Sequence, residues 1–298
     1  MKQAWRKTLF FFLVVLFLIL APFLLLYSQG IRFDFEKKRF TFTGAIYLKA
    51  IPKQAKVFLN GKFVKKTDLI FGSVKIKNLI PKKYLIEIKK EGYFPWKKEL
   101  EVKEKEVTEA TGIVLFPKKI KFKKTKVKMN DFENLKRKKG ISCKEILKSL
   151  GFGIENNFQK ECFAQKFGEK IFLISANNLY EFVFEKEGFE KIFENIKGWE
   201  RFGEKMAVFL EHEIWLFDKE GKKFLIRETS RIKDVAFLNE NYLVFLAGKK
   251  VKIVETDTRD KLNLYEIGEI EGEKIAINEK REILLMTEDG FLISESLY

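Results

Sequence analysis

The segment that most constrains this chain is an uncharged apolar run near its start, Thr8–Tyr27. At about 1.5 Å per residue, a helix of that length spans about 30 Å, which is the thickness of the hydrocarbon core of a bilayer. Pro22 is compatible with such a helix, because membrane-spanning helices accommodate a proline kink. The sequence therefore predicts a transmembrane helix over residues 8–27.

A cleaved signal peptide is the alternative to a membrane anchor. Such peptides have an apolar core of roughly 7–15 residues followed by small residues at the cleavage site. Here the run is longer, and Tyr27-Ser28-Gln29-Gly30 makes a poor cleavage site, so we expect an uncleaved, single-pass anchor in the cell membrane. Lys2, Arg6 and Lys7 precede the run without any acidic residue. The positive-inside rule then predicts that residues 1–7 are cytoplasmic and that the body is extracytoplasmic.

Short strands with alternating polarity follow a juxtamembrane segment at residues 28–43. The expected strands are Ala45–Ala50, Lys56–Leu59, Lys62–Val64, Ser73–Lys77, Lys83–Ile88, Lys97–Val102 and Thr111–Phe116. Asn60-Gly61 supplies the two-residue turn with positive φ that closes a tight hairpin. This spacing of short strands and turn signals predicts a small β-sandwich over residues 44–117.

The turn and packing residues of this segment occur in a recognisable order. They are Ile51-Pro52-Lys53-Gln54-Ala55-Lys56-Val57, Asn60-Gly61, Thr67-Asp68-Leu69, Pro81-Lys82-Lys83-Tyr84 and Gly92-Tyr93. In that order they resemble the PEGA domain family. The resemblance implies an extracytoplasmic β-sandwich of bacterial and archaeal surface proteins, without catalytic residues.

The resemblance also implies structural roles for the motif residues. These residues are Pro52, Ala55, Val57, Asn60, Gly61, Pro81, Tyr84, Gly92 and Tyr93. Gly92 and Tyr93 are interpreted as a turn and a packing aromatic, with a ligand-binding pair as the alternative. The sequence departs from the family pattern at Gln54 and Lys82, where the family has glycine, and at Asp68, where it has proline.

Four apolar runs recur in the second half of the chain at intervals of 35, 36 and 41 residues. They begin at Ile171, Met206, Tyr242 and Ile283, and each is followed by a polar turn and a second apolar run. Four short strands per roughly 40 residues make up one blade of a β-propeller. We therefore predict an all-β chain whose residues 161–298 form a propeller-like module of about four blades, with an unclosed β-meander as the alternative.

The last repeat reaches Tyr298 after only three strands. Propellers often close with a strand from the start of the domain. The candidate here is Ile120–Val127, within a lysine-rich connector at residues 118–160. Asn130–Gly151 reads as helical or irregular, with one short helix at Cys143–Leu150.

The formal net charge of +16 is concentrated in that connector, where Lys118–Gly140 holds eleven basic and two acidic residues. Near an anionic surface, each basic side chain contributes about 1 kcal/mol of attraction. The candidate contact residues for lipid head groups or an anionic cell-wall polymer are Lys118, Lys119, Lys121, Lys123, Lys124, Lys126, Lys128, Arg137, Lys138 and Lys139. A solvated linker is the alternative, and an external location disfavours nucleic acid as the partner.

Residues that could carry catalysis or bind a metal are sparse. Two cysteines, Cys143 and Cys162, and one histidine, His212, cannot supply the four ligands of a zinc site. The cysteines either pair in an oxidising compartment or remain free thiols. His212 lies at a polar turn, where solvation explains it better than catalysis, and calcium binding at Asp257 and Asp260 is a weak alternative to a solvated turn.

We therefore expect no catalytic, cofactor-binding or metal-binding residues and no cofactor. The leading interpretation is a membrane-anchored surface protein with a binding or structural scaffold role. Its partners are the lipid bilayer and one of three alternatives: an anionic cell-wall polymer, lipid head groups or another surface protein. Two alternatives remain. One is a propeller-based enzyme or sensor whose site is not recognisable from sequence, and the other is a cytoplasm-facing protein that binds nucleic acid.

Overall fold

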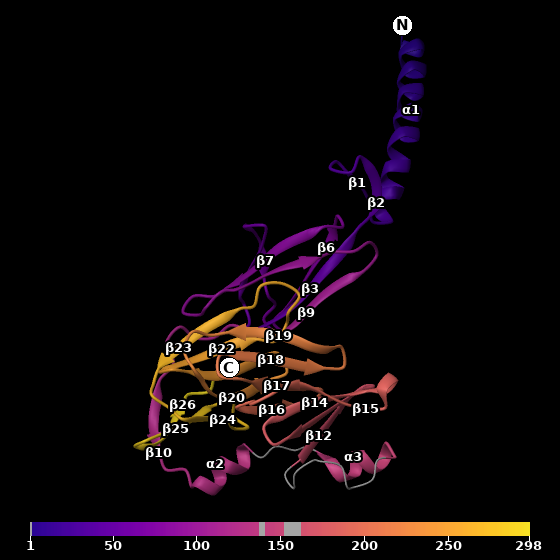
Figure 1. Ribbon diagram of the computed structural model, residues 1–298. Coiled ribbons are helices and arrows are strands. Elements are labelled where there is room, and N and C mark those ends of the chain that lie inside the picture. Colours follow the sequence, from indigo (N-terminus) through magenta and orange to yellow (C-terminus); the bar gives the residue numbers. More distant parts are fainter. Residues whose placement is uncertain (1, 137–140, 152–161) are drawn as a thin grey trace. The chain divides into compact units, whose positions relative to one another are not determined.

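The computed structural model describes residues 2–136, 141–151 and 162–298, and the chain divides into two compact units (Figure 1). The first unit comprises residues 1–90 and 95–115, and the second comprises residues 91–94 and 116–298. Strands dominate both units, which confirms the predicted all-β class with an N-terminal helix.

The first unit begins with helix α1 (Lys2–Ser28), which contains Pro22. Within it, Trp5–Ser28 is long and apolar enough to cross a membrane, and none of this span is buried against the rest of the chain. A two-stranded hairpin of β1 (Ile31–Asp34) and β2 (Arg39–Phe42) follows immediately. Sequence analysis expected only a juxtamembrane segment there.

The rest of the first unit is a sandwich of two sheets, as predicted. A three-stranded sheet has the order β6-β3-β9, and a four-stranded sheet has the order β5-β4-β7-β8. The strands are β3 (Gly44–Ile51), β4 (Lys56–Leu59), β5 (Lys62–Lys66), β6 (Ser73–Leu79), β7 (Lys83–Lys89), β8 (Trp96–Glu101) and β9 (Val107–Val114). Alternating residues of both sheets fill the core, where Ile46, Val57 and Trp96 are fully buried.

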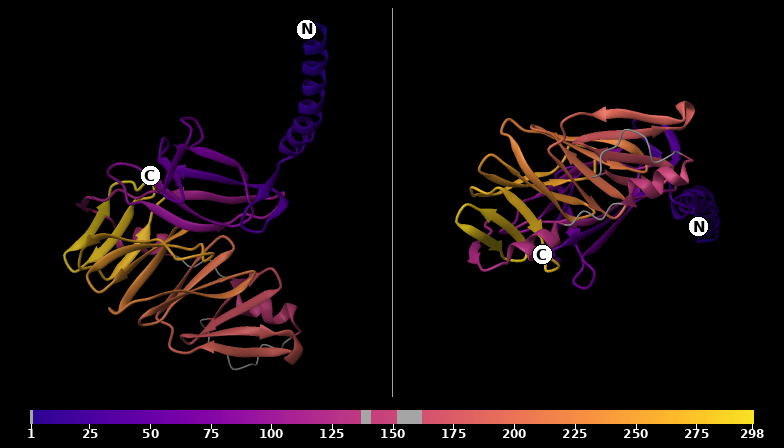
Figure 2. Two further views of the ribbon diagram at one scale, coloured as in Figure 1. Left: turned by 90° about the horizontal axis from the view of Figure 1, so that it is seen from above. Right: turned by 60° about the horizontal axis from the view of Figure 1, so that its bottom comes forward.

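The described part of the second unit contains four antiparallel sheets that follow one another in chain order (Figure 2). The strands of the first three sheets are β11 (Ile141–Ser142), β12 (Cys162–Phe167), β13 (Lys170–Ser175), β14 (Asn178–Val183) and β15 (Gly188–Phe193); β16 (Gly198–Phe202), β17 (Lys205–Phe209), β18 (Glu213–Asp218) and β19 (Gly221–Arg227); and β20 (Ile232–Asn239), β21 (Tyr242–Ala247), β22 (Lys250–Glu255) and β23 (Leu264–Glu269). In each of these sheets the strands pair in chain order. The first strands of successive sheets also contact one another: β16 contacts β20, and β20 contacts β24 (Lys274–Ile277), the first strand of the fourth sheet. This is the arrangement of propeller blades, and it confirms a propeller-like module of about four sheets.

The fourth sheet is completed by a strand from far earlier in the chain. It contains β24 (Lys274–Ile277), β25 (Ile283–Thr287) and β26 (Gly290–Ser294), and β10 (Phe122–Thr125) pairs antiparallel with β26. β10 is shorter than the candidate segment 120–127. It caps the edge of β26 that the last repeat would otherwise leave unpaired.

Short helices flank the sheets: α2 (Met129–Leu135), α3 (Cys143–Ser149) and the 3₁₀ turn Phe184–Lys186. Cys143 at the start of α3 is bonded to Cys162 at the start of β12, with Cα atoms 5.5 Å apart. The disulfide therefore ties α3 to the first sheet. Sequence analysis had left pairing and free thiols open.

Candidate functional site

The motif residues of the sandwich serve the fold. Ala55 and Val57 are fully buried, and the buried Tyr84 donates its hydroxyl to the Ile80 carbonyl at 2.9 Å. Asn60 and Gly61 have φ of 49° and 78°, which is the left-handed pair that a tight hairpin requires. Pro52 and Pro81 are half-buried in the connections before β4 and β7. Gly92 and Tyr93 group with the second unit, where Tyr93 forms a bridge with Pro117.

Two of the departures from the motif have visible physical solutions. Gln54 adopts φ of 60°, the conformation that glycine takes most readily, and its amide nitrogen donates to the Thr67 carbonyl at 3.0 Å. Asp68 organises the loop before β6, since its carboxylate accepts the backbone N–H of Ile70, Phe71 and Ser73 at 2.9, 2.6 and 2.6 Å. The Ser73 hydroxyl and these N–H groups hold the pKa of Asp68 below its usual range.

The basic segment before α2 lies on the surface. All seven of its described lysine side chains are exposed: Lys118, Lys119, Lys121, Lys123, Lys124, Lys126 and Lys128. Within the described part of the chain, no ion pair holds any of their ammonium groups. Arg137, Lys138 and Lys139 lie outside the described residues. The seven lysines are therefore positioned to meet an external anion, while their role stays a prediction.

Lys136, which belongs to the same basic stretch, behaves differently. Its side chain is 17% exposed, and its ammonium group lies 2.9 Å from Asp234 and 3.8 Å from Glu200. It also donates to the Val235 carbonyl at 2.8 Å. Glu200 lies on β16 and Asp234 on β20, so Lys136 ties the end of α2 to the first strands of two sheets.

A cavity of about 600 Å³ adjoins this contact, lined among others by Phe132, Trp199, Lys233 and Glu273. A cavity of this size is a place to look for an enzymatic site. Its central carboxylate, Asp234, is already engaged. The two oxygens accept the backbone N–H of Val235 and of Ile275, both at 2.9 Å, in addition to the Lys136 ammonium. Asp234 therefore joins α2, β20 and β24, which is a structural role.

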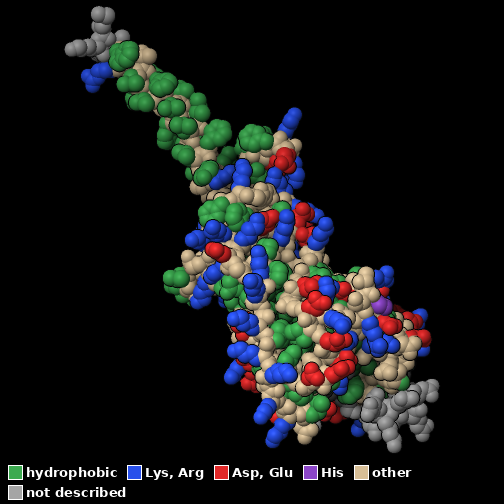
Figure 3. All heavy atoms as spheres, turned by 90° about the vertical axis from the view of Figure 1, so that its left-hand side faces the viewer, with side chains coloured by type: hydrophobic (Ala, Val, Ile, Leu, Met, Phe, Trp, Pro, Cys, Tyr) green, Lys and Arg blue, Asp and Glu red, His purple; other side chains and the backbone are tan. Residues whose placement is uncertain are grey.

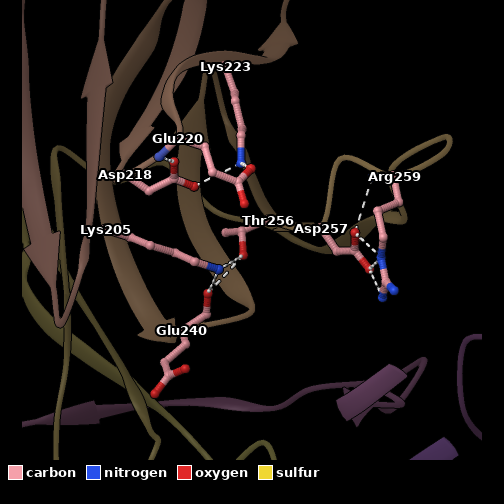
Figure 4. A network of polar contacts seen from close by, with 8 residues as sticks. All are labelled: Lys205, Asp218, Glu220, Lys223, Glu240, Thr256, Asp257 and Arg259. Atoms are coloured by element: carbon pink, nitrogen blue, oxygen red, sulfur yellow. Dashed lines mark hydrogen bonds and ion pairs between the residues drawn. The ribbon is translucent and has the colours of Figure 1, made fainter. Parts of the chain in front are cut away.

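A second polar network joins neighbouring sheets on strands β17 to β22 (Figure 4). Lys205 donates to the Glu240 carbonyl at 2.8 Å and to the Thr256 hydroxyl at 3.1 Å. Burial lowers the pKa of Lys205, although the nearby Asp218 carboxylate opposes this effect. A lysine of lowered pKa is a candidate nucleophile, but here the ammonium is held by two acceptors from another sheet. The arrangement fits a structural link.

The other residues considered for chemistry are similarly placed. His212 is exposed, and its Nδ1 lies 3.2 Å from the Glu228 carbonyl. The Asp257 carboxylate is engaged by Arg259, at 2.7 Å for the closest pair (Figure 4). Among the described residues, no three His, Cys, Asp or Glu side chains come together as metal ligands would.

The geometry of the sandwich and the order of its motif agree with a family match. Residues 43–114 match the PEGA domain. This stretch of the chain is a PEGA domain. The matched range agrees closely with the predicted 44–117, and the PEGA domain contains all seven strands β3 to β9. No curated protein matches the sequence.

Several solved structures are partly similar to the chain. The N-terminal domain of Nup159 has 11% identity over 41% of this chain and 38% of its own, with a TM-score of 0.31. The computationally designed Ika4 protein has 10% identity over 49% of this chain and 96% of its own, with a TM-score of 0.36. PorZ, a bacterial surface component of the type-IX secretion system of Porphyromonas gingivalis, has 14% identity over 48% of this chain and 21% of its own, with a TM-score of 0.32.

The chain thus spans less than half the length of the Nup159 domain and about a fifth of PorZ. The propeller-like description of the second unit rests on its own strand pairing.

Proposed function

We propose that this protein is a single-pass membrane protein that holds its PEGA domain and its propeller-like module outside the cytoplasm. There it serves as a binding or structural scaffold and not as an enzyme. One observation carries the proposal: an apolar helix long enough to cross a bilayer is followed, after one short hairpin, by a PEGA domain. PEGA domains are extracytoplasmic modules, so a helix in this position acts as the anchor.

The Cys143–Cys162 disulfide supports the external location. Disulfides persist in oxidising compartments and are rare in the cytosol. The two cysteines are the only ones in the chain, and both are in this bond. Lys2, Arg6 and Lys7 before the helix favour the same orientation.

The occupied polar groups of the second unit support a scaffold. The buried Asp234 and the half-buried Lys205 are both engaged: the first accepts two backbone N–H groups, and the second donates to two oxygens beside a neighbouring sheet. The exposed lysines of residues 118–128 are the part of the surface that suits a partner, in the form of lipid head groups or an anionic wall polymer.

Protease accessibility tests the topology. An epitope tag placed after Tyr298 should be digested by protease added to intact cells from which the wall has been removed. A tag placed before Lys2 should survive until the membrane is permeabilised. Protection of the C-terminal tag in intact cells would contradict the proposal and favour the cytoplasm-facing alternative.

Thiol labelling gives a second readout of the same topology. In the extracytoplasmic location, Cys143 and Cys162 should resist maleimide under denaturing conditions until a reductant is added. If both thiols react without reductant in freshly lysed cells, the oxidising location is wrong.

A further inference from the structure

The hairpin between α1 and the PEGA domain has two chemically different faces. Because side chains alternate along a strand, the pairs Ile31↔Phe42 and Phe33↔Phe40 lie on one face of the β1–β2 ribbon. The turn residue Phe35 extends this face, with its ring centroid 5.1 Å from that of Phe33. Phe33 and Phe40 form an edge-to-face pair at 5.2 Å.

These rings are exposed to a degree that is unusual for aromatic residues. The exposed fractions are 82% for Phe35, 56% for Phe40 and 37% for Phe33. Burying a phenylalanine side chain is worth roughly 1.5–3 kcal/mol. Three such rings side by side form an apolar patch, and its burial against another apolar surface is energetically favourable.

The opposite face of the ribbon is polar and is bonded to the PEGA domain. Thr41 donates its hydroxyl to Glu104 at 2.6 Å, and the Arg39 guanidinium lies 3.6 Å from the same carboxylate. Lys82 pairs with Glu36 at 2.7 Å. The polar face is thus held against the domain. On the aromatic face the Lys105 ammonium covers the Phe42 ring at 3.7 Å, while Phe33, Phe35 and Phe40 stay exposed.

The aromatic face is continuous with the end of α1. From the polar face, Arg32 ties the hairpin to α1: it donates to the Tyr27 carbonyl at 3.1 Å, and its guanidinium lies 3.4 Å from the centre of the Tyr27 ring. Phe23 and Leu24 of α1 and Phe33 and Phe40 of the hairpin line one apolar hollow of about 480 Å³. Hydrophobic side chains gather beside the base of the helix in Figure 3.

We propose that the β1–β2 hairpin is a lipid-binding element, in which Phe33, Phe35 and Phe40 enter the leaflet around the C-terminal end of α1. The occupant is phospholipid, because the patch continues the surface of a helix that itself lies in lipid. Elements that lie in the interface bury faces of Trp, Phe and Leu side chains, and these faces sink about 5–10 Å into the boundary between head groups and acyl chains. Lys37 and Lys38 in the turn are placed to meet phosphate groups.

This inference rests on the proposed membrane anchor, and the experiment separates the two. The full-length protein is reconstituted in phosphatidylcholine vesicles after a single cysteine is introduced and labelled with an environment-sensitive fluorophore. The native cysteines are paired, so the wild-type protein supplies the labelling background. One variant is Phe35→Cys, and a second, Leu18→Cys, reports on the helix. For residue 18, which lies near the middle of the helix, quenching is measured with a nitroxide near the terminal methyl of the acyl chain. For the other labels the nitroxide is attached near the glycerol end, and iodide in the water is used separately for every label.

Phe71→Cys is the matched control. Phe71 is a phenylalanine of the same unit, 66% exposed. It lies beside the C-terminal end of β3, where Gly72 accepts the Ala50 N–H at 2.9 Å, whereas the hairpin precedes the N-terminal end of β3. The eight residues of β3 separate the two ends by roughly 25 Å.

The expected result is that the label at residue 35 loses most of its emission to the lipid nitroxide and little to iodide, and that the label at residue 71 shows the reverse. Iodide quenching at residue 35 with lipid quenching at residue 18 would overturn the hairpin proposal and leave the anchor intact. Absence of lipid quenching at residue 18 would overturn the anchor and the hairpin proposal with it. Protection of residue 35 from both quenchers would also overturn the proposal, since it would mean that a protein surface covers the patch.

Discussion

At the residue scale, charged side chains inside the second unit link strands and helices to one another through hydrogen bonds and ion pairs. Asp234 accepts hydrogen bonds from β20, β24 and the lysine that ends α2, and Lys205 links β17 to the turn before β21. A partly buried charge is stable only when opposite charges or hydrogen bonds surround it. By residue type alone, these residues would be candidates for catalysis. Their polar atoms already have hydrogen-bond partners within the protein, which argues against that interpretation.

Lys136 provides a direct test of this view. Lys136→Ala leaves two largely buried carboxylates, Asp234 and Glu200, without their cation, and loss of one partner of a buried pair costs about 3–5 kcal/mol. The free energy of unfolding of the full-length protein, measured by denaturant titration in detergent, should fall by that order. Lys128→Ala removes an exposed lysine of the same stretch and should change it by no more than about 0.5 kcal/mol. If the two variants lower the free energy of unfolding equally, Lys136 does not stabilise the link between α2 and the two sheets.

Asp68 gives a prediction with a defined pH dependence. Its carboxylate has a lowered pKa in the folded state, so its stabilising effect is complete above the unfolded pKa of about 3.9 and is lost as the pH falls further. Asp68→Asn should therefore lower the melting temperature of the PEGA domain at pH 7, and the difference from wild type should shrink in strong acid. Asp131→Asn, at an exposed carboxylate of α2, is the control. A difference that is the same at both pH values would contradict the charge-based explanation.

At the element scale, local signals predicted some strands well and pairing decided others. β4 spans residues 56–59 as predicted, and the two-residue turn Asn60-Gly61 sets the pair Leu59↔Lys62, although a bulge between Val57 and Phe58 shifts the register farther from the turn. β9 was expected at residues 111–116 but spans 107–114. Its first four residues, Val107-Thr-Glu-Ala, carry only one large apolar side chain, and they become a strand because they pair in parallel with β3.

The hairpin β1–β2 was missed for a different reason. Ile31-Arg-Phe-Asp and Arg39-Phe-Thr-Phe do alternate in polarity, and that signal was available. Each strand has only four residues, and a two-stranded ribbon is marginally stable alone. Its stability comes from Glu104 and α1, which are contacts that the sequence does not display. For the same reason, the contacts of Lys136 and Lys205 with neighbouring sheets could not be predicted from the sequence.

The pairing of β10 with β26 can be tested with two neighbouring proline substitutions. The Glu295 N–H donates to the Lys121 carbonyl, and antiparallel pairs alternate, so the Lys123 N–H faces Ile293 and the Lys124 N–H faces away from β26. Lys123→Pro should break the ladder, expose the edge of β26 and promote aggregation, whereas Lys124→Pro should be tolerated at this edge strand. Thermal melting and light scattering of the two variants decide the matter, and identical behaviour would count against closure through β10.

At the scale of the whole molecule, the sequence was sufficient to predict the order of parts: an apolar helix, a PEGA domain, a basic segment and a propeller-like module. The length of an apolar run, the residues of a turn and the spacing of repeats are local properties of the sequence. They can be recognised without knowing how the chain packs. What the chain binds depends on which side chains come together in space. That is known only from the exposure of the side chains and their ion pairs in the structure. The contrast between Lys136 and its neighbours illustrates this difference, since both belong to one run of lysines.

The exposed lysines lead to the last prediction, which concerns the partner. Seven lysines and no acidic residue lie between Lys118 and Lys128, and each contributes about 1 kcal/mol near an anionic surface. Replacing Lys118 and Lys119 by glutamine should therefore weaken binding of the full-length protein to a purified anionic wall polymer by roughly thirtyfold at low salt. Affinity should also fall as salt is added, because exposed charges are screened.

The control for that experiment is a pair of exposed lysines on β5, Lys62 and Lys65, changed to glutamine in the same way. They carry the same charge but lie outside the basic segment, so the change should leave the affinity nearly as it is. Equal loss in both variants would mean that total charge, and not the segment, governs binding. A duplex DNA competitor completes the test. DNA could displace the polymer at a phosphate concentration far below that of the polymer's own anionic groups, and could do so through the same two lysines. In that case the segment is a nucleic-acid site, and the proposed external scaffold loses its partner.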